Sequence, residues 1–156
     1  TSFIADIQQG VLETARKEGY ELVVHPCDFG SADLVNELNQ FIDRLKLAGA
    51  ILLPPVSESA EVAEMLKRAG CHHVRILSAP LDEPQHMVLS NDREAVTQVA
   101  DHLIDLGHRD IGFIHGPKTS SAALERHIGF SEALAQRGVK LLKRNVAQYL
   151  LEMSQK

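Results

Sequence analysis

Apolar residues recur at steps of three and four in five segments, and short runs rich in β-branched residues separate these segments. The five predicted helices cover about Phe3–Glu18, Ser31–Leu45, Ser59–Ala69, Asn91–Gly107 and Ala122–Arg137. The predicted strands cover Tyr20–His25, Gly49–Leu53, His73–Leu77, His86–Leu89, Asp110–His115 and, in a weaker pattern, Asn145–Gln148. This regular alternation of helix and strand predicts an α/β protein.

Turn and cap residues mark the predicted ends of the helices and strands. Gly49–Leu53 is apolar throughout, as expected for a parallel strand covered on both faces, and Pro54-Pro55 ends it. Ser31 and Asn91 are expected to cap the helices that follow them, Asn91 together with Glu94 in a capping box.

A proline-containing loop, residues 78–85, marks a change in organisation. We place a lobe boundary near Leu89–Asn91, so that residues 1–90 form most of a first lobe and residues 91–156 begin a second. No strand precedes the first helix, although a doubly wound sheet conventionally starts with a central strand. The pattern also degrades after Val139, with a helix stub expected at residues 149–156, so the sequence is expected to be a piece of a longer protein.

Composition narrows the function classes. With 156 residues, 44% of them hydrophobic and 24% charged, the chain is expected to fold as an ordinary globular protein. Its net charge of −5 gives no basic surface for nucleic acid or an anionic membrane. The two cysteines are too few for a disulfide framework and favour a reducing compartment. No apolar run approaches the ~18 residues that a membrane span needs.

Position in the fold nominates candidate binding segments, because parallel α/β sheets bind ligands beyond the carboxyl ends of their strands. These segments are Thr1–Phe3, Cys27–Ser31, Pro54–Ser57, Ser78–Asp82 and Gly116–Ser121. None contains a nucleotide-binding fingerprint, and no cofactor is expected. The adjacent pair His72-His73 lacks the spacing of a metal site, and no metal is expected.

Two residues carry both a functional and a structural interpretation. Arg126 lies early in the fifth helix, where its guanidinium can fork two hydrogen bonds to hydroxyls or a carboxylate, or can pair at the surface with Glu125 or Glu132. The ring of Phe3 can stack on a sugar face or can only staple the start of the first helix. A small enzyme with Cys27 as nucleophile and His25 as base is a further alternative, against which a buried, inert thiol is the simpler interpretation.

The stretch HLIDLGHRDIGFIHGPKTSSAALERHIGF, His102–Phe130, closely resembles a signature of the LacI/GalR family of bacterial repressors. Upstream, FIADIQQGVLETARKEGYELVVHPCD, GAILLPPVSE and SNDREA resemble that family's first helix and second strand, its third strand, and its crossing between lobes. The likeness covers about Thr1–Gly138.

The resemblance implies a fold of the periplasmic-binding-protein type I, with Rossmann-like parallel sheets in two lobes, here partial and without the first strand. It implies a cytoplasmic, non-enzymatic, homodimeric transcription regulator that binds a small effector, often a sugar. Operator DNA would be contacted only through a headpiece that these residues do not contain. The alternative is a sugar-binding transport protein of the same architecture.

The likeness also nominates effector-binding residues. Arg126 matches the family's effector-binding arginine, and Phe3, with its neighbour Ser2, matches the aromatic position after the first strand. Pro54 and Ser57 fall in the loop after the third strand, and Asn91 falls in the crossing. The sequence departs from the family at Leu77-Ser78, where many relatives place an effector-contacting Asp, and at Ala122, where a small hydroxyl residue is usual.

Overall fold

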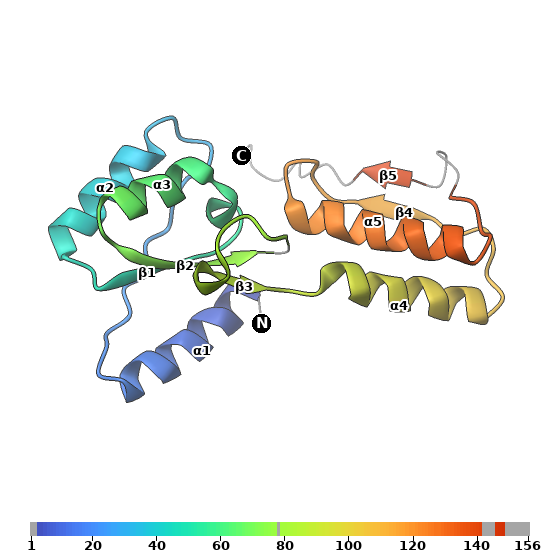
Figure 1. The fold of residues 1–156 in the computed structure, drawn as a ribbon, viewed down its shortest axis with the longest axis horizontal. Helices are drawn as coiled ribbons and strands as arrows, with labels where there is room; N and C mark the ends of the chain where they lie inside the picture. Colours follow the sequence, from blue (N-terminus) through green and yellow to red (C-terminus); the bar gives the residue numbers. More distant parts are fainter. Residues whose placement is uncertain (1–2, 78, 142–145, 149–156) are drawn as a thin grey trace, which may run out of the picture. The chain divides into compact units, whose positions relative to one another are not determined.

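The computed structural model (Figure 1) describes residues 3–77, 79–141 and 146–148. The chain divides into two compact units, Thr1–Lys46 and Leu47–Lys156. The first unit contains helices α1, Phe3–Lys17, and α2, Leu34–Leu45. The described elements of the second unit are β1 Gly49–Leu52, η1 Val56–Glu58, α3 Ala60–Arg68, β2 His72–Leu77, η2 Pro84–His86, β3 Met87–Leu89, α4 Asp92–Asp105, β4 Phe113–His115, α5 Ser121–Gln136 and β5 Val146–Gln148.

The apolar stripe of α2 is buried and that of α1 is not. Leu34, Leu38 and Ile42 are buried, as the spacing predicts, whereas none of the residues of α1 is buried. The predicted helix is present in both segments. Burial needs another part of the chain packed against the stripe, and the described residues do not supply one for α1.

Two further predictions for the first unit are wrong. Residues 20–28 contain no strand, because a strand forms only when a neighbour completes its hydrogen bonds and no described strand pairs with this segment. Ser31 does not cap α2, which begins three residues later with Asp33 at the N-cap position. The Ser31 hydroxyl instead accepts a hydrogen bond from the amide of Asp33 in the preceding turn.

A parallel three-stranded sheet in the order β1-β2-β3 forms the first part of the second unit. The side chain of Ser59 caps α3 by accepting the amide hydrogen of Val62. Helix α3 contributes Val62, Ala63, Met65 and Leu66 to the core, and Figure 1 shows it lying over one face of this sheet.

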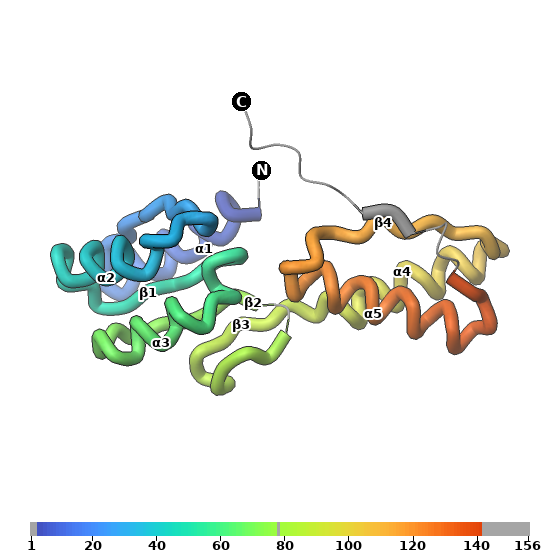
Figure 2. The backbone as a smooth tube through the Cα atoms, turned by 90° about the horizontal axis from the view of Figure 1, so that it is seen from above, coloured from blue at the N-terminus to red at the C-terminus, as the bar shows by residue number. Residues whose placement is uncertain are grey.

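Strands β4 and β5 form a separate parallel pair, and helices α4 and α5 lie side by side in both views (Figures 1 and 2). The core of this part consists of Ala100, Ile104, Phe130, Ala133, Leu134 and Val139, with Phe113 of β4 packed against it. Gly107 and Gly138 follow the ends of the two helices with positive φ angles of 90° and 69°, a conformation that glycine adopts readily.

The predicted lobe boundary at residues 89–91 falls inside the second unit, between β3 and α4, and stays a prediction. Asn91 occupies the N-cap position of α4, but its side chain makes no capping hydrogen bond, so the predicted capping box is absent. The helix stub predicted at residues 149–156 lies outside the described residues. Within the described ranges, no helix has both the length and the apolar character of a membrane span.

Candidate functional site

The turn after β1 lies at the carboxyl edge of the sheet, where ligands of such folds bind. Two backbone hydrogen bonds close it, from Ser57 N to Leu53 O at 2.9 Å and from Glu58 N to Pro55 O at 3.0 Å. Ser57 is completely buried and its hydroxyl has no hydrogen-bond partner among the described groups. In this turn the side chain of Ser57 therefore lies in the core, whereas the next residue, Glu58, is only half-buried.

A buried arginine holds this turn from the next strand. Arg75 of β2 is 3% exposed, and its Nε donates to the backbone oxygen of Ser57 at 2.7 Å. A terminal amino group of the same guanidinium donates to Asp82 Oδ2 at 3.2 Å and to Leu81 O at 3.4 Å. The arginine thus ties the turn after β1 to the loop after β2.

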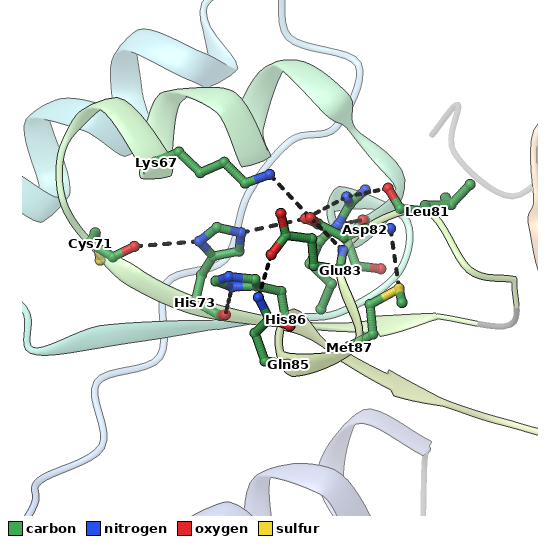
Figure 3. Close-up of polar contacts among 11 residues, drawn as sticks. Lys67, Cys71, His73, Leu81, Asp82, Glu83, Gln85, His86 and Met87 are labelled. Atoms are coloured by element: carbon green, nitrogen blue, oxygen red, sulfur yellow. Dashed lines mark hydrogen bonds and ion pairs between the residues drawn. The ribbon is translucent and has the colours of Figure 1, made fainter.

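Asp82 is the centre of this charged cluster (Figure 3). Its side chain is 4% exposed, Lys67 Nζ lies 3.1 Å from Oδ1, and His73 Nε2 lies 3.7 Å from Oδ2. Burial raises the pKa of Asp82, but hydrogen bonds from the Glu83 amide, Lys67 and Arg75 lower it by more, so the net pKa is well below the usual range. Asp82 is therefore a buried carboxylate that neutralises Arg75.

The sequence contains a signal for this cluster. Residues His73, Arg75 and Leu77 alternate on the buried face of β2, so the period of two places an arginine beside a core leucine. A buried arginine requires an acidic partner, and Asp82 lies seven residues further along the chain, in a segment nominated above.

The first turn of α5, which follows β4, carries two hydrogen-bond donors of Ser121. Ser120 caps the helix by accepting the amide hydrogen of Ala123 at 3.3 Å. The amide and hydroxyl of Ser121 both donate to the carboxylate of Glu58, whose turn follows β1. The first amides of a helix lack partners within the helix, and the carboxylate supplies one.

Arg126 lies on the solvent side of α5. Its side chain is 53% exposed, and its Nε donates to Asp92 Oδ1 of α4 at 2.6 Å. Neither Glu125 nor Glu132 pairs with it among the described contacts, because both lie near Arg93. The two terminal amino groups of Arg126 have no hydrogen-bond partner among the described residues.

The neighbouring His127 contacts two aromatic rings of β4. Its ring centroid lies 4.8 Å from that of His115 and 5.5 Å from that of Phe113. Burial and the charge of His115 lower the pKa of His127. His127 therefore belongs to this group of rings, while the neighbouring Arg126 stays available to solvent.

The remaining residues nominated from the sequence lie in different settings. Pro54 is half-buried, Ser57 is buried and Asn91 is exposed, all within the second unit. Phe3 is exposed in the first unit, and Ser2 lies outside the described residues. Sequence reasoning missed Glu58, Arg75 and the role of Ser121, which the structure joins to the turn at Ser57.

A shallow hollow of about 420 Å³ lies elsewhere, at the amino ends of β1 and β2. Its lining residues are Gly49, Ala50, Ile51, His72, His73, Val74, Gln85 and His86. None of the nominated residues lines it. Because ligands of parallel sheets bind at the opposite, carboxyl ends, we do not assign the effector to this hollow.

Cys27 has the features of a structural thiol. Burial, and then the carboxylate of Glu37, raise its pKa, and its Sγ lies 3.5 Å from the backbone oxygen of His25. The His25 ring instead bonds Glu37 at 3.0 Å. A raised pKa removes thiolate, so the geometry does not favour a nucleophile and base.

Comparisons with known proteins identify relatives along the whole chain. Residues 1–155 match the family of "Periplasmic binding proteins and sugar binding domain of LacI family". The HTH-type transcriptional repressor PurR of Mannheimia succiniciproducens is 25% identical over 142 residues, which are 90% of this chain and 42% of PurR. The chain therefore spans less than half the length of this relative.

Solved structures give the same fold. Transcription regulator CcpA of Lactococcus lactis superposes with a TM-score of 0.79 at 20% identity, covering 95% of this chain and 54% of that one. A complex of the transcriptional regulator CelR with cellobiose gives a TM-score of 0.78 at 25% identity, covering 94% and 45%. The fold predicted from the sequence, a partial periplasmic-binding-protein-like α/β core, is confirmed.

Proposed function

The chain belongs to the LacI/GalR family and corresponds to part of the effector-binding core of its members. On that premise we propose that it senses a small molecule for a DNA-binding transcription regulator. Binding would act through a difference in affinity between two arrangements of the regulator, since only such a difference shifts a conformational equilibrium.

The observation that carries this proposal is the state of Arg126. Its guanidinium is half-exposed, is oriented by Asp92 through Nε, and keeps both terminal amino groups free of described partners. A planar fork held in this way can donate two parallel hydrogen bonds to vicinal hydroxyls or to a carboxylate.

We assign the effector to the sugar class. CelR, a regulator of the same fold, is described in complex with cellobiose, and the matched family is defined by sugar-binding domains. Of the residues nominated from the sequence, Pro54 and Asn91 of the second unit are the further proposed contacts.

The proposed partners follow from the family. Operator DNA would be bound by a headpiece outside these 156 residues, because a chain of net charge −5 offers no basic surface for phosphates. The regulator would act in the cytoplasm as a homodimer, which sedimentation at several concentrations can test. The named relatives are transcriptional regulators, which favours this function over sugar transport and over catalysis.

Calorimetry with glucose and cellobiose tests the site. We expect Arg126→Lys to weaken sugar binding by about 1–3 kcal/mol, since lysine cannot form the two parallel hydrogen bonds. Arg137→Lys is the matched control, because Arg137 lies on the same helix and also pairs with α4 carboxylates, those of Asp101 and Asp105. Equal affinities of the two variants would remove Arg126 from the site, and no heat with either sugar would contradict the sugar assignment.

A further inference from the structure

Glu58 and Ser121 are far apart in the sequence and meet through three hydrogen bonds. The amide of Ser121 donates to both carboxylate oxygens of Glu58 at 3.2 Å, and the Ser121 hydroxyl donates to Oε1 at 2.8 Å. The two residues are 63 positions apart, on the turn that follows β1 and on the first residue of the helix that follows β4. The contact therefore links the part of the unit built on β1-β2-β3 to the part built on β4-β5.

Charge and helix geometry both favour this contact. Ser121 is the first residue of α5, so its amide has no acceptor inside the helix, and Ser120 caps a different amide, that of Ala123. The carboxylate of Glu58 accepts the hydrogen bond of this amide. It lies at the N-terminus of a 16-residue helix, which is the positive end of the helix dipole. Hydrogen bonds from neutral donors to a carboxylate are stronger than neutral pairs.

The turn that carries Glu58 is also held by contacts that do not involve Ser121. Arg75 fixes the backbone oxygen of Ser57, the preceding residue, and is itself neutralised by Asp82. A contact made from a turn whose backbone is fixed loses less conformational entropy than one made from a mobile turn.

We propose that Glu58 and Ser121 form a polar latch that joins the two parts of the second unit. Arg75 acts as its positioning residue. Resting on the proposed function, the latch raises the fraction of molecules in the binding-competent arrangement and so strengthens effector binding.

Amide hydrogen exchange in the 156-residue chain tests the latch. In Glu58→Ala the exchange of the Ser121 amide should accelerate about tenfold, as expected for the loss of a hydrogen bond to a charged group. The amide of Val139, which bonds Leu134 O at 2.8 Å beyond the end of α5, should keep its rate and reports that the helix is intact. Glu61→Gln is the matched control, because Glu61 lies three residues away on α3 and is exposed.

Unchanged exchange at Ser121 in Glu58→Ala, with Val139 still protected, would overturn the latch. Should this variant lose Val139 protection, the isosteric Glu58→Gln decides the matter. A neutral amide oxygen is a weaker acceptor than a carboxylate, so the Ser121 amide should still exchange several-fold faster than in the unmodified chain. Ser121 exchange at the unmodified rate in Glu58→Gln would also overturn the proposal.

Cellobiose binding tests the consequence for function. Glu58→Ala should bind cellobiose several-fold more weakly than Glu61→Gln, and equal or tighter binding would overturn the effect on the effector. Failure of the unmodified chain to bind would count against the proposed function, while the exchange rates would still decide the latch.

Discussion

Gly129 of α5 lies directly against the backbone of Arg93 in α4. A Cβ atom added at Gly129 would overlap the Arg93 carbonyl oxygen and would lie 3.0 Å from its carbonyl carbon. The hydroxyl of Thr97 lies between the same two backbones, 2.9 Å from Arg93 O and 3.3 Å from Gly129 O. The glycine therefore sets how closely the two helices approach each other.

Gly129→Ala should strongly destabilise the chain, because both obstructing atoms belong to a helix backbone that cannot move aside locally. We expect a loss of about 2–3 kcal/mol in the free energy of unfolding, in the range of overpacked cores. Urea denaturation followed by circular dichroism measures it. Gly10→Ala in α1 is the control, since a Cβ there meets nothing within 4 Å and alanine favours a helix by roughly 1 kcal/mol. Equal stability of the two variants would show that the close approach is absent.

Asp82→Asn should also be destabilising, through a different cause. The substitution removes the negative charge that neutralises Arg75, which is almost completely buried. Removing one partner of a buried ion pair costs about 3–5 kcal/mol, and urea denaturation at pH 7 should show a loss near the lower end. Asp101→Asn breaks an exposed pair with Arg137 and should cost less than about 1 kcal/mol. A similarly small loss for Asp82→Asn would contradict the role given to the cluster.

Because of Asp82, the free energy of unfolding should depend on pH in the acid range. The pKa of Asp82 is lower in the folded chain than the ordinary value of 3.8. The unfolded chain therefore binds this proton more readily, and the stabilisation is complete well above pH 3.8 and is lost as the pH falls below it. Unfolding free energies measured from pH 6 downwards should decline more steeply for the unmodified chain than for Asp82→Asn. Parallel curves would exclude Asp82 as the source.

The two thiols should react slowly with alkylating reagents. Burial raises the pKa of Cys71, and burial and then the charge of Glu37 raise that of Cys27. Because only the thiolate attacks, both cysteines should react with iodoacetamide at pH 8 more slowly than free cysteine does. Cys27→Ser and Cys71→Ser each leave one thiol and separate the two rates. A rate for Cys27 above that of free cysteine would reopen the enzymatic alternative.

The helices and most strands of this protein could be predicted from local pattern. The stripe Leu34, Leu38 and Ile42 is buried as its spacing predicts, and Ser59 caps α3. These features depend on neighbours within about one helical turn, which a single sequence specifies. Segment Tyr20–His25 shows the limit, because its apolar, β-branched residues have the character of a strand but form none without a pairing partner.

By itself, the sequence determined the order of elements, the ends of α4 and α5 at glycines, and the family signature that contains Arg126. Only the tertiary structure decided that Arg126 pairs with Asp92, that Arg75 is buried against Asp82, and that Glu58 meets Ser121. The partners in the first and third of these pairs lie 34 and 63 residues apart. Such contacts depend on how helices and strands pack in space, and spacing along the chain specifies only which side chains share a face.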